Sequence, residues 1–140
     1  YGAGNLRSVA KAVEAAAVRE GIDANVQVTD APEVVAAADR IVLPGVGAFG
    51  QCAAALRSLG GMEAAMTEAV DARGVPFLGV CVGMQLLGSR GTEHGVHQGL
   101  GWIAGEVEKL APADPMLKVP HMGWNAVKFT LPGFAHPVLK

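Results

Sequence analysis

The chain has 140 residues, of which 51% are hydrophobic and 17% charged, a composition typical of one globular domain rather than of a disordered or fibrous protein. Its 11 Lys and Arg residues against 13 Asp and Glu give a net charge of −2, without the basic stripe that nucleic-acid binding requires. No apolar run reaches the roughly 18 residues of a membrane-spanning helix, and no charged-then-apolar leader opens the chain. We therefore expect a cytoplasmic protein that binds no nucleic acid or membrane.

The first half of the chain alternates helical and extended patterns. Apolar residues recur at helical spacing from 8 to 20, where Ser8 is a suitable cap and Gly21 a suitable stop. Residues 24–29 alternate as a strand does, and an alanine-rich helix ending near Asp39 follows. The run 40–43 predicts a buried strand that Pro44 ends.

Two helices, at about 51–58 and 62–73, and a buried strand at 76–80 are predicted next. Strands separated by helices imply crossover connections, and hence an open α/β sheet with mainly parallel strands. Such sheets bind ligands at the carboxyl ends of their strands, where two glycine loops fall here. Beyond Ser89 the chain is rich in Gly and His, and 105–110 and 119–129 are predicted to be extended.

The segment Gly79-Val80-Cys81-Val82-Gly83 has the form of a nucleophile elbow, with a buried strand before it and a helix-compatible sequence after it. Glycines flank the nucleophile in such turns because a Cβ there would clash with the crowded backbone. A thiolate at Cys81 would attack a carboxamide carbon, and the N–H of Val82 would help to hold the oxyanion. The alternative is an ordinary core cysteine, since Cys is often buried.

The second loop, residues 44–50 (PGVGAFG), contains G-x-G-x-x-G after a strand. A dinucleotide site would need an acidic residue at the end of the next strand, but that strand ends with Cys81. The N–H groups of Val46 and Gly47 are better suited to form the other half of an oxyanion hole. A simple strand-to-loop turn is the alternative. Both Cys52, which follows this loop, and Cys81 are expected to be reduced.

Four segments, 1–8, 44–50, 79–87 and 120–125, occur in an order and at distances that resemble the class I glutamine amidotransferases. The first and last resemble the glutaminase subunits of imidazole glycerol phosphate synthase in particular. The resemblance implies a flavodoxin-like α/β fold, an open, mainly parallel sheet with helices on both faces. It also implies one amidotransferase domain over residues 1–140 that lacks its first strand and its C-terminal part, and so is incomplete at both ends.

The same resemblance implies hydrolysis of glutamine to glutamate and ammonia, with no metal or other cofactor. The ammonia would pass to a cyclase subunit with a (β/α)8 barrel, in a heterodimer that makes imidazole glycerol phosphate and the purine precursor AICAR for histidine biosynthesis. For Trp124, the resemblance implies a contact with the cyclase, and packing in the core is the alternative. The roles implied for matching positions are nucleophile for Cys81; oxyanion hole for Val46, Gly47 and Val82; glutamine binding for Gly45, Gly47 and Gln85; and cyclase interface for Asn5, Met122 and Trp124.

The chain departs from the family in lacking the late His-Pro-Glu that supplies the acid–base partner. His136-Pro137 continues with Val138, and the other histidines, His94, His97 and His121, are expected to be surface or structural residues. We therefore expect this chain by itself to be inactive. Other readings stay open: a class I amidotransferase of pyridoxal phosphate, anthranilate or guanylate synthesis, a scaffold that kept the elbow, or a cysteine hydrolase.

Overall fold

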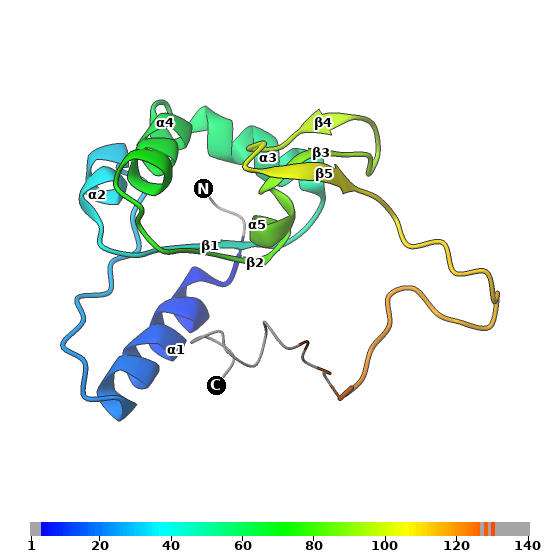
Figure 1. Ribbon diagram of the computed structural model, residues 1–140, viewed down its shortest axis with the longest axis horizontal. Coiled ribbons are helices and arrows are strands. Elements are labelled where there is room, and N and C mark those ends of the chain that lie inside the picture. Colours follow the sequence, from blue (N-terminus) through cyan, green and yellow to red (C-terminus); the bar gives the residue numbers. More distant parts are fainter. Residues whose placement is uncertain (1–3, 127, 129, 131–140) are drawn as a thin grey trace. The chain divides into compact units, whose positions relative to one another are not determined.

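The computed structural model describes residues 4–126, 128 and 130 (Figure 1). The chain divides into two units, Tyr1–Lys109 and Leu110–Lys140. The helices and strands of the described residues all belong to the first unit. In chain order they are α1 (Leu6–Arg19), α2 (Pro32–Ala37), β1 (Ile41–Gly45), α3 (Phe49–Ser58), α4 (Met62–Thr67), the π-helical segment η1 (Glu68–Ala72), β2 (Phe77–Cys81), α5 (Val82–Gln85), β3 (Gly88–Gly91), β4 (His97–Gln98) and β5 (Ile103–Val107).

Strands β1 and β2 form a parallel pair whose register runs from Ile41 opposite Phe77 to Gly45 opposite Cys81. Parallel neighbours need a crossover, which α3, α4 and η1 supply. The predicted α/β class with parallel strands and crossover helices is thus confirmed, consistent with a flavodoxin-like fold. Within the described residues a second, smaller sheet has the order β4-β3-β5, with β3 antiparallel to β4 and parallel to β5.

The core of the first unit lies between strand β1 and the helices that follow the two glycine loops. Phe49 and Cys52 of α3 and Leu86, which follows α5, are almost completely buried. The rings of Phe77 and Trp102 pack edge to face at its margin, with centroids 4.9 Å apart. Both glycine loops therefore start helices anchored in one core, made of Leu43, Phe49, Cys52, Ala53, Leu56, Met62, Met66, Val82 and Leu86.

The first predicted helix is present, but its cap is not the expected residue. α1 begins at Leu6 because the side chain of Asn5 accepts a hydrogen bond from the N–H of Ser8 at 3.2 Å. An Asn side chain there satisfies one of the N–H groups that every helix start leaves without a partner. The prediction of Ser8 as the cap was therefore wrong by three residues.

Two predicted extended segments are not strands in the structure. Residues 24–29 have a strand-like pattern but form no ladder with another described segment, and a β-strand exists only where a neighbour completes its hydrogen bonds. Residues 119–126 are exposed and likewise unpaired, while 127 and 129 lie outside the described residues. The segment predicted at 105–110 begins earlier, as β5. The helix predicted at 62–73 divides into α4 and η1.

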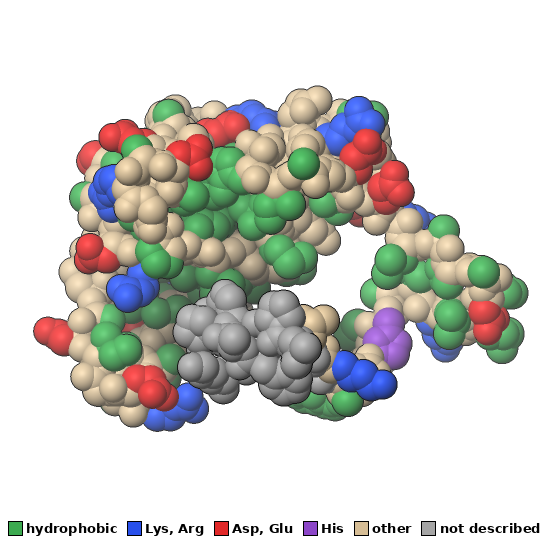
Figure 2. All heavy atoms as spheres, viewed as in Figure 1, with side chains coloured by type: hydrophobic (Ala, Val, Ile, Leu, Met, Phe, Trp, Pro, Cys, Tyr) green, Lys and Arg blue, Asp and Glu red, His purple; other side chains and the backbone are tan. Residues whose placement is uncertain are grey.

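One face of β2 is partly exposed among the described residues, whereas parallel strands are usually covered on both faces. Hydrophobic side chains are visible at the surface of the first unit, among its charged groups (Figure 2). Leu78 and Val80 point away from Phe77 because side chains alternate along a strand, and they are 55% and 39% exposed. Among the described residues no helix is both long and apolar enough to cross a membrane.

Candidate active site

Cys81 lies at the turn between β2 and α5. Its φ is 56° and its ψ is −122°, a conformation that residues with a side chain rarely adopt and that costs of order 1–3 kcal/mol. The residue is exposed and its thiol is not part of a disulfide. The sequence predicts a sharp strand-to-helix turn at this position, and the structure contains one. The alternative, a cysteine packed in the core, is wrong for Cys81.

The two glycines of the elbow are required by contacts with backbone atoms. A Cβ at Gly79 would lie 2.5 Å from the Cα of Met84, and one at Gly83 would overlap the carbonyl oxygen of Leu43. Neither glycine has a positive φ, so the constraint at both is steric rather than conformational. The start of α5 is thereby pressed against β1, and no other residue type fits at Gly79 or Gly83 unless the backbone moves.

Strand register brings the second glycine loop beside the elbow. Gly45 pairs with Cys81, so Val46 and Gly47 leave the sheet at the end where the thiol is exposed. Gly47 has a φ of +96°, and the side chain of Val46 is 57% exposed. The N–H groups of Val46, Gly47 and Val82 donate no hydrogen bond to any described residue. One end of the β1–β2 pair thus carries a thiol and three amide donors.

Two side chains hold the second loop. The thiol of Cys52 donates a hydrogen bond to the carbonyl oxygen of Val46 at 3.2 Å. The N–H of Phe49 donates to Oε2 of Glu93 at 3.0 Å, and this carboxylate caps α3 in place of Ala48, which has no capping side chain. Sequence reasoning missed both residues. Nothing in the pattern of residues 44–50 points to a partner 44 positions further on.

The segment from β3 to β4 packs closely on the start of α3. A Cβ at Gly50 would lie 2.6 Å from the imidazole ring of His97, and a Cβ at Gly91 would lie 2.5 Å from the ring of Phe49. Gly50 is the last glycine of the G-x-G-x-x-G pattern. Its role in the structure is therefore to make room for a ring, not to approach a phosphate.

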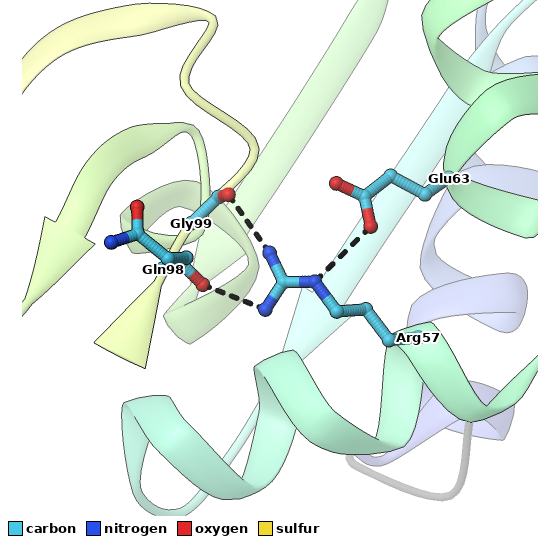
Figure 3. A network of polar contacts seen from close by, with 4 residues as sticks. All are labelled: Arg57, Glu63, Gln98 and Gly99. Carbon is cyan, nitrogen blue, oxygen red and sulfur yellow. Dashed lines mark hydrogen bonds and ion pairs between the residues drawn. The ribbon is translucent and has the colours of Figure 1, made fainter. Parts of the chain in front are cut away.

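The other end of this segment is fixed by Arg57, at the end of α3 (Figure 3). Its guanidinium donates to the carbonyl oxygens of Gln98 at 2.9 Å and Gly99 at 3.0 Å, and its Nε pairs with Glu63 at 3.2 Å. The three bonds use different nitrogens of one planar group, as Figure 3 shows. Residues 91–99 thus contact α3 near the start and near the end of that helix.

The remaining predicted site residues lie on three elements. Gln85 is half-buried at the end of α5, four residues after Cys81. Asn5 caps α1. Met122 and Trp124 belong to the second unit and are 85% and fully exposed. Whether Trp124 packs in a core or faces a partner stays a prediction.

Neither described histidine of the first unit, His94 or His97, is hydrogen-bonded to Cys81. His94 is exposed, His97 packs over Gly50, and Nε2 of His121 contacts the amide nitrogen of Asn125 at 2.7 Å. His136 lies outside the described residues. In the part of the chain that the structure describes, no group of three His, Cys, Asp or Glu residues is placed to hold a metal ion.

An ion pair also lies on the small sheet. The guanidinium of Arg90 on β3 donates a hydrogen bond to the carboxylate of Glu106 on β5, and this bond raises the pKa of the guanidinium. An arginine is charged at neutral pH even without such a partner. The ion pair thus joins β3 to β5 at two residues that are opposite each other in the register.

Residues 4–130 match the family model described as glutamine amidotransferase class-I. The chain belongs to this family.

Within this family, the chain is similar to proteins that share one name. The chain is 54% identical over 138 residues to "Imidazole glycerol phosphate synthase subunit HisH" of Agrobacterium fabrum, covering 99% of this chain and 62% of that protein. It is 55% identical to the protein of the same name from Rhizobium meliloti, over 99% of this chain and 62% of the relative. For Zymomonas mobilis the identity is 54%, over 100% of this chain and 63% of the relative. The chain therefore spans just under two thirds of the length of these relatives.

Proposed function

We propose that the protein is the glutamine amidotransferase subunit of an imidazole glycerol phosphate synthase and hydrolyses glutamine to glutamate and ammonia. The observation that carries the proposal is Cys81, exposed at a positive φ between β2 and α5 with Gly45 of the second loop beside it. Strain of this kind persists only where the surrounding structure imposes it, and it is common at catalytic nucleophiles.

In the proposed reaction the thiolate of Cys81 adds to the carboxamide carbon of glutamine, and the carbonyl electrons move to its oxygen. Collapse of this intermediate breaks the C–N bond, and the nitrogen leaves as ammonia after taking up a proton. Water then hydrolyses the thioester, which releases glutamate and restores the thiolate. The proton transfers need an acid–base partner, and our prediction remains that a His and a Glu outside this chain supply it.

The oxyanion of the intermediate would be held by the N–H groups of Val46, Gly47 and Val82. Their lack of partners among the described residues and their position at the end of the sheet that carries Cys81 support this role. Each such donor is worth about 2.7–4 kcal/mol where deletion has been measured. Gly45, Gly47 and Gln85 would bind the rest of the glutamine.

We further propose that ammonia passes to a cyclase subunit with a (β/α)8 barrel, in a cytoplasmic heterodimer of histidine biosynthesis that forms imidazole glycerol phosphate and AICAR. The names of the relatives support this assignment. Asn5, Met122 and Trp124 would face the cyclase. The exposure of Met122 and Trp124 suits an interface, where large apolar and aromatic side chains are enriched.

The test uses the full-length protein together with the cyclase. We expect formation of imidazole glycerol phosphate with either glutamine or free ammonia as nitrogen source. A glutamine-mimicking alkylator should label Cys81, abolish the glutamine-dependent reaction and leave the ammonia-dependent one. An unlabelled Cys81 would favour a scaffold, and glutaminase activity coupled to a different synthase would favour another class I amidotransferase.

Robust turnover by the 140-residue chain with the cyclase would show that one of its own histidines is the acid–base partner.

A further inference from the structure

The thiol of Cys52 makes an unusual contact for a buried cysteine. Its side chain is completely buried in the first turns of α3, where a cysteine ordinarily serves as a small apolar residue. Here the sulfur donates at 3.2 Å to the carbonyl oxygen of Val46, whose own side chain is mostly exposed. A rigid core position is thus connected directly to the backbone of the second loop.

The orientation of one peptide group follows from this contact. The carbonyl of Val46 and the N–H of Gly47 belong to the same planar trans peptide and point in opposite directions. Because the carbonyl is directed at Cys52 on α3, the N–H of Gly47 is directed away from α3. It finds no acceptor among the described residues on that side.

Gly47 makes this orientation easy to lose. Its φ is +96°, and glycine populates positive and negative φ about equally, so the chain itself does little to fix the Val46–Gly47 peptide. A rotated peptide would present a carbonyl oxygen where a donor is needed. An oxygen there would repel a developing oxyanion instead of stabilising it.

We propose that Cys52 is a positioning residue for glutamine hydrolysis: through Val46 it keeps the N–H of Gly47 turned toward the open side of the loop, as a donor to the oxyanion. This inference rests on the proposed function and deepens it. Cys52 is not proposed to touch the substrate or the reacting atoms, and its proposed effect on catalysis is through the carbonyl of Val46.

The experiment compares Cys52→Ala, which removes the donor, with Cys52→Ser, which keeps one. Both are made in the full-length protein, assayed with the cyclase, and kcat is normalised to sites titrated with the glutamine-mimicking alkylator. For Cys52→Ala we expect kcat to fall about 10-fold while KM changes less than about twofold, because misplacing one oxyanion donor affects the transition state selectively. Cys52→Ser should recover kcat to within about threefold of the wild type. The rate at which iodoacetamide alkylates Cys81 should be the same in all three proteins.

Leu56→Val is the matched control, because Leu56 is also buried on α3 but makes no hydrogen bond to the second loop. It should lower the free energy of unfolding without changing kcat per titrated site. If Cys52→Ala is too unstable to assay, Cys52→Val removes the donor while filling the space. Unchanged kcat in the variants without a donor, or an equal loss in Cys52→Ser, would overturn the inference. A wild-type complex that releases no glutamate would instead overturn the proposed function.

Discussion

The two glycine loops at the end of the β1–β2 pair are built by different means. The elbow, residues 79–83, is fixed by backbone packed on backbone, since the atoms facing Gly79 and Gly83 belong to the main chain of α5 and β1. The second loop, residues 44–50, is fixed by side chains that reach it from α3 and from residues 91–97. A glycine that faces main-chain atoms cannot be replaced by a larger residue, whereas a side chain that contacts a loop can be replaced by another side chain. The elbow is therefore the rigid partner of the pair and the second loop the adjustable one.

The largest effect should follow loss of the group that the rigid loop presents. Cys81→Ala in the full-length protein with the cyclase is expected to lower glutamine-dependent turnover by at least about 10³-fold, because no other group can form the thioester. Ammonia-dependent synthesis should remain at the wild-type rate, which serves as the control for folding and assembly. Glutamate release within tenfold of the wild type would exclude Cys81 as the nucleophile.

The steric claim for the elbow is tested by Gly83→Ala. We expect the free energy of unfolding of the full-length protein to fall by about 3 kcal/mol or more, since the new methyl would overlap the carbonyl oxygen of Leu43. Gly60→Ala is the matched control, because Gly60 has open space around it and should change stability by less than about 0.5 kcal/mol. Equal stabilities in chemical denaturation would mean that the elbow backbone adapts.

The contrast predicts that a clash in the second loop, unlike one in the elbow, can be relieved. Gly50→Ala is expected to cost about 1–3 kcal/mol of stability because its methyl meets the ring of His97. Adding His97→Ala removes that ring, so a double-mutant cycle on unfolding free energies should give a favourable coupling of about 1 kcal/mol. Strict additivity of the two changes would show that the ring is not what Gly50 accommodates.

The attachment of β4 to α3 should depend on the carbonyl bonds of Arg57 more than on its ion pair. Arg57→Ala is expected to cost about 1–2 kcal/mol, because the carbonyls of Gln98 and Gly99 lose a charged donor. Glu63→Ala should cost less than about 1 kcal/mol, since the pair is partly exposed. Chemical unfolding measures both, and an equal loss would assign the contribution to the salt bridge.

The smallest effect is expected at the cap of α3. Glu93→Ala should lower the free energy of unfolding by about 1 kcal/mol, the usual value of a lost N-cap. Glu93→Gln keeps an acceptor for the N–H of Phe49 and should lose only part of that amount. Thermal unfolding of the two variants side by side decides whether the contact is a cap. A Gln variant as unstable as the Ala variant would argue against it.

Much of the local structure could be predicted because it depends on nearby residues. The helices near 6–19, 32–37 and 49–58 and the positions of the strands before both glycine loops follow from periodicity, Pro32 and the glycine stops. The predicted end of the first strand at Pro44 was wrong, because β1 continues to Gly45, and the second strand, expected to be buried, is partly exposed. The prediction of a strand at 24–29 was wrong, because a strand also needs a partner strand. These residues have a strand pattern but pair with no other described segment. The cap at Asn5 in place of Ser8 shows the usual uncertainty of a helix boundary.

By itself the sequence determined the elbow, because G-x-Cys-x-G between a strand and a helix admits few backbone paths and places the thiol at the turn. It also marked the second loop as belonging to the same end of the sheet, since parallel strands end together. Only the tertiary structure decided what holds that second loop: a buried thiol below it, a carboxylate 44 residues from the N–H that it caps, and an imidazole over its last glycine. Steric rules act between neighbours in the chain and are visible in a pattern, whereas contacts between distant side chains exist only once the strands have paired and the core has closed.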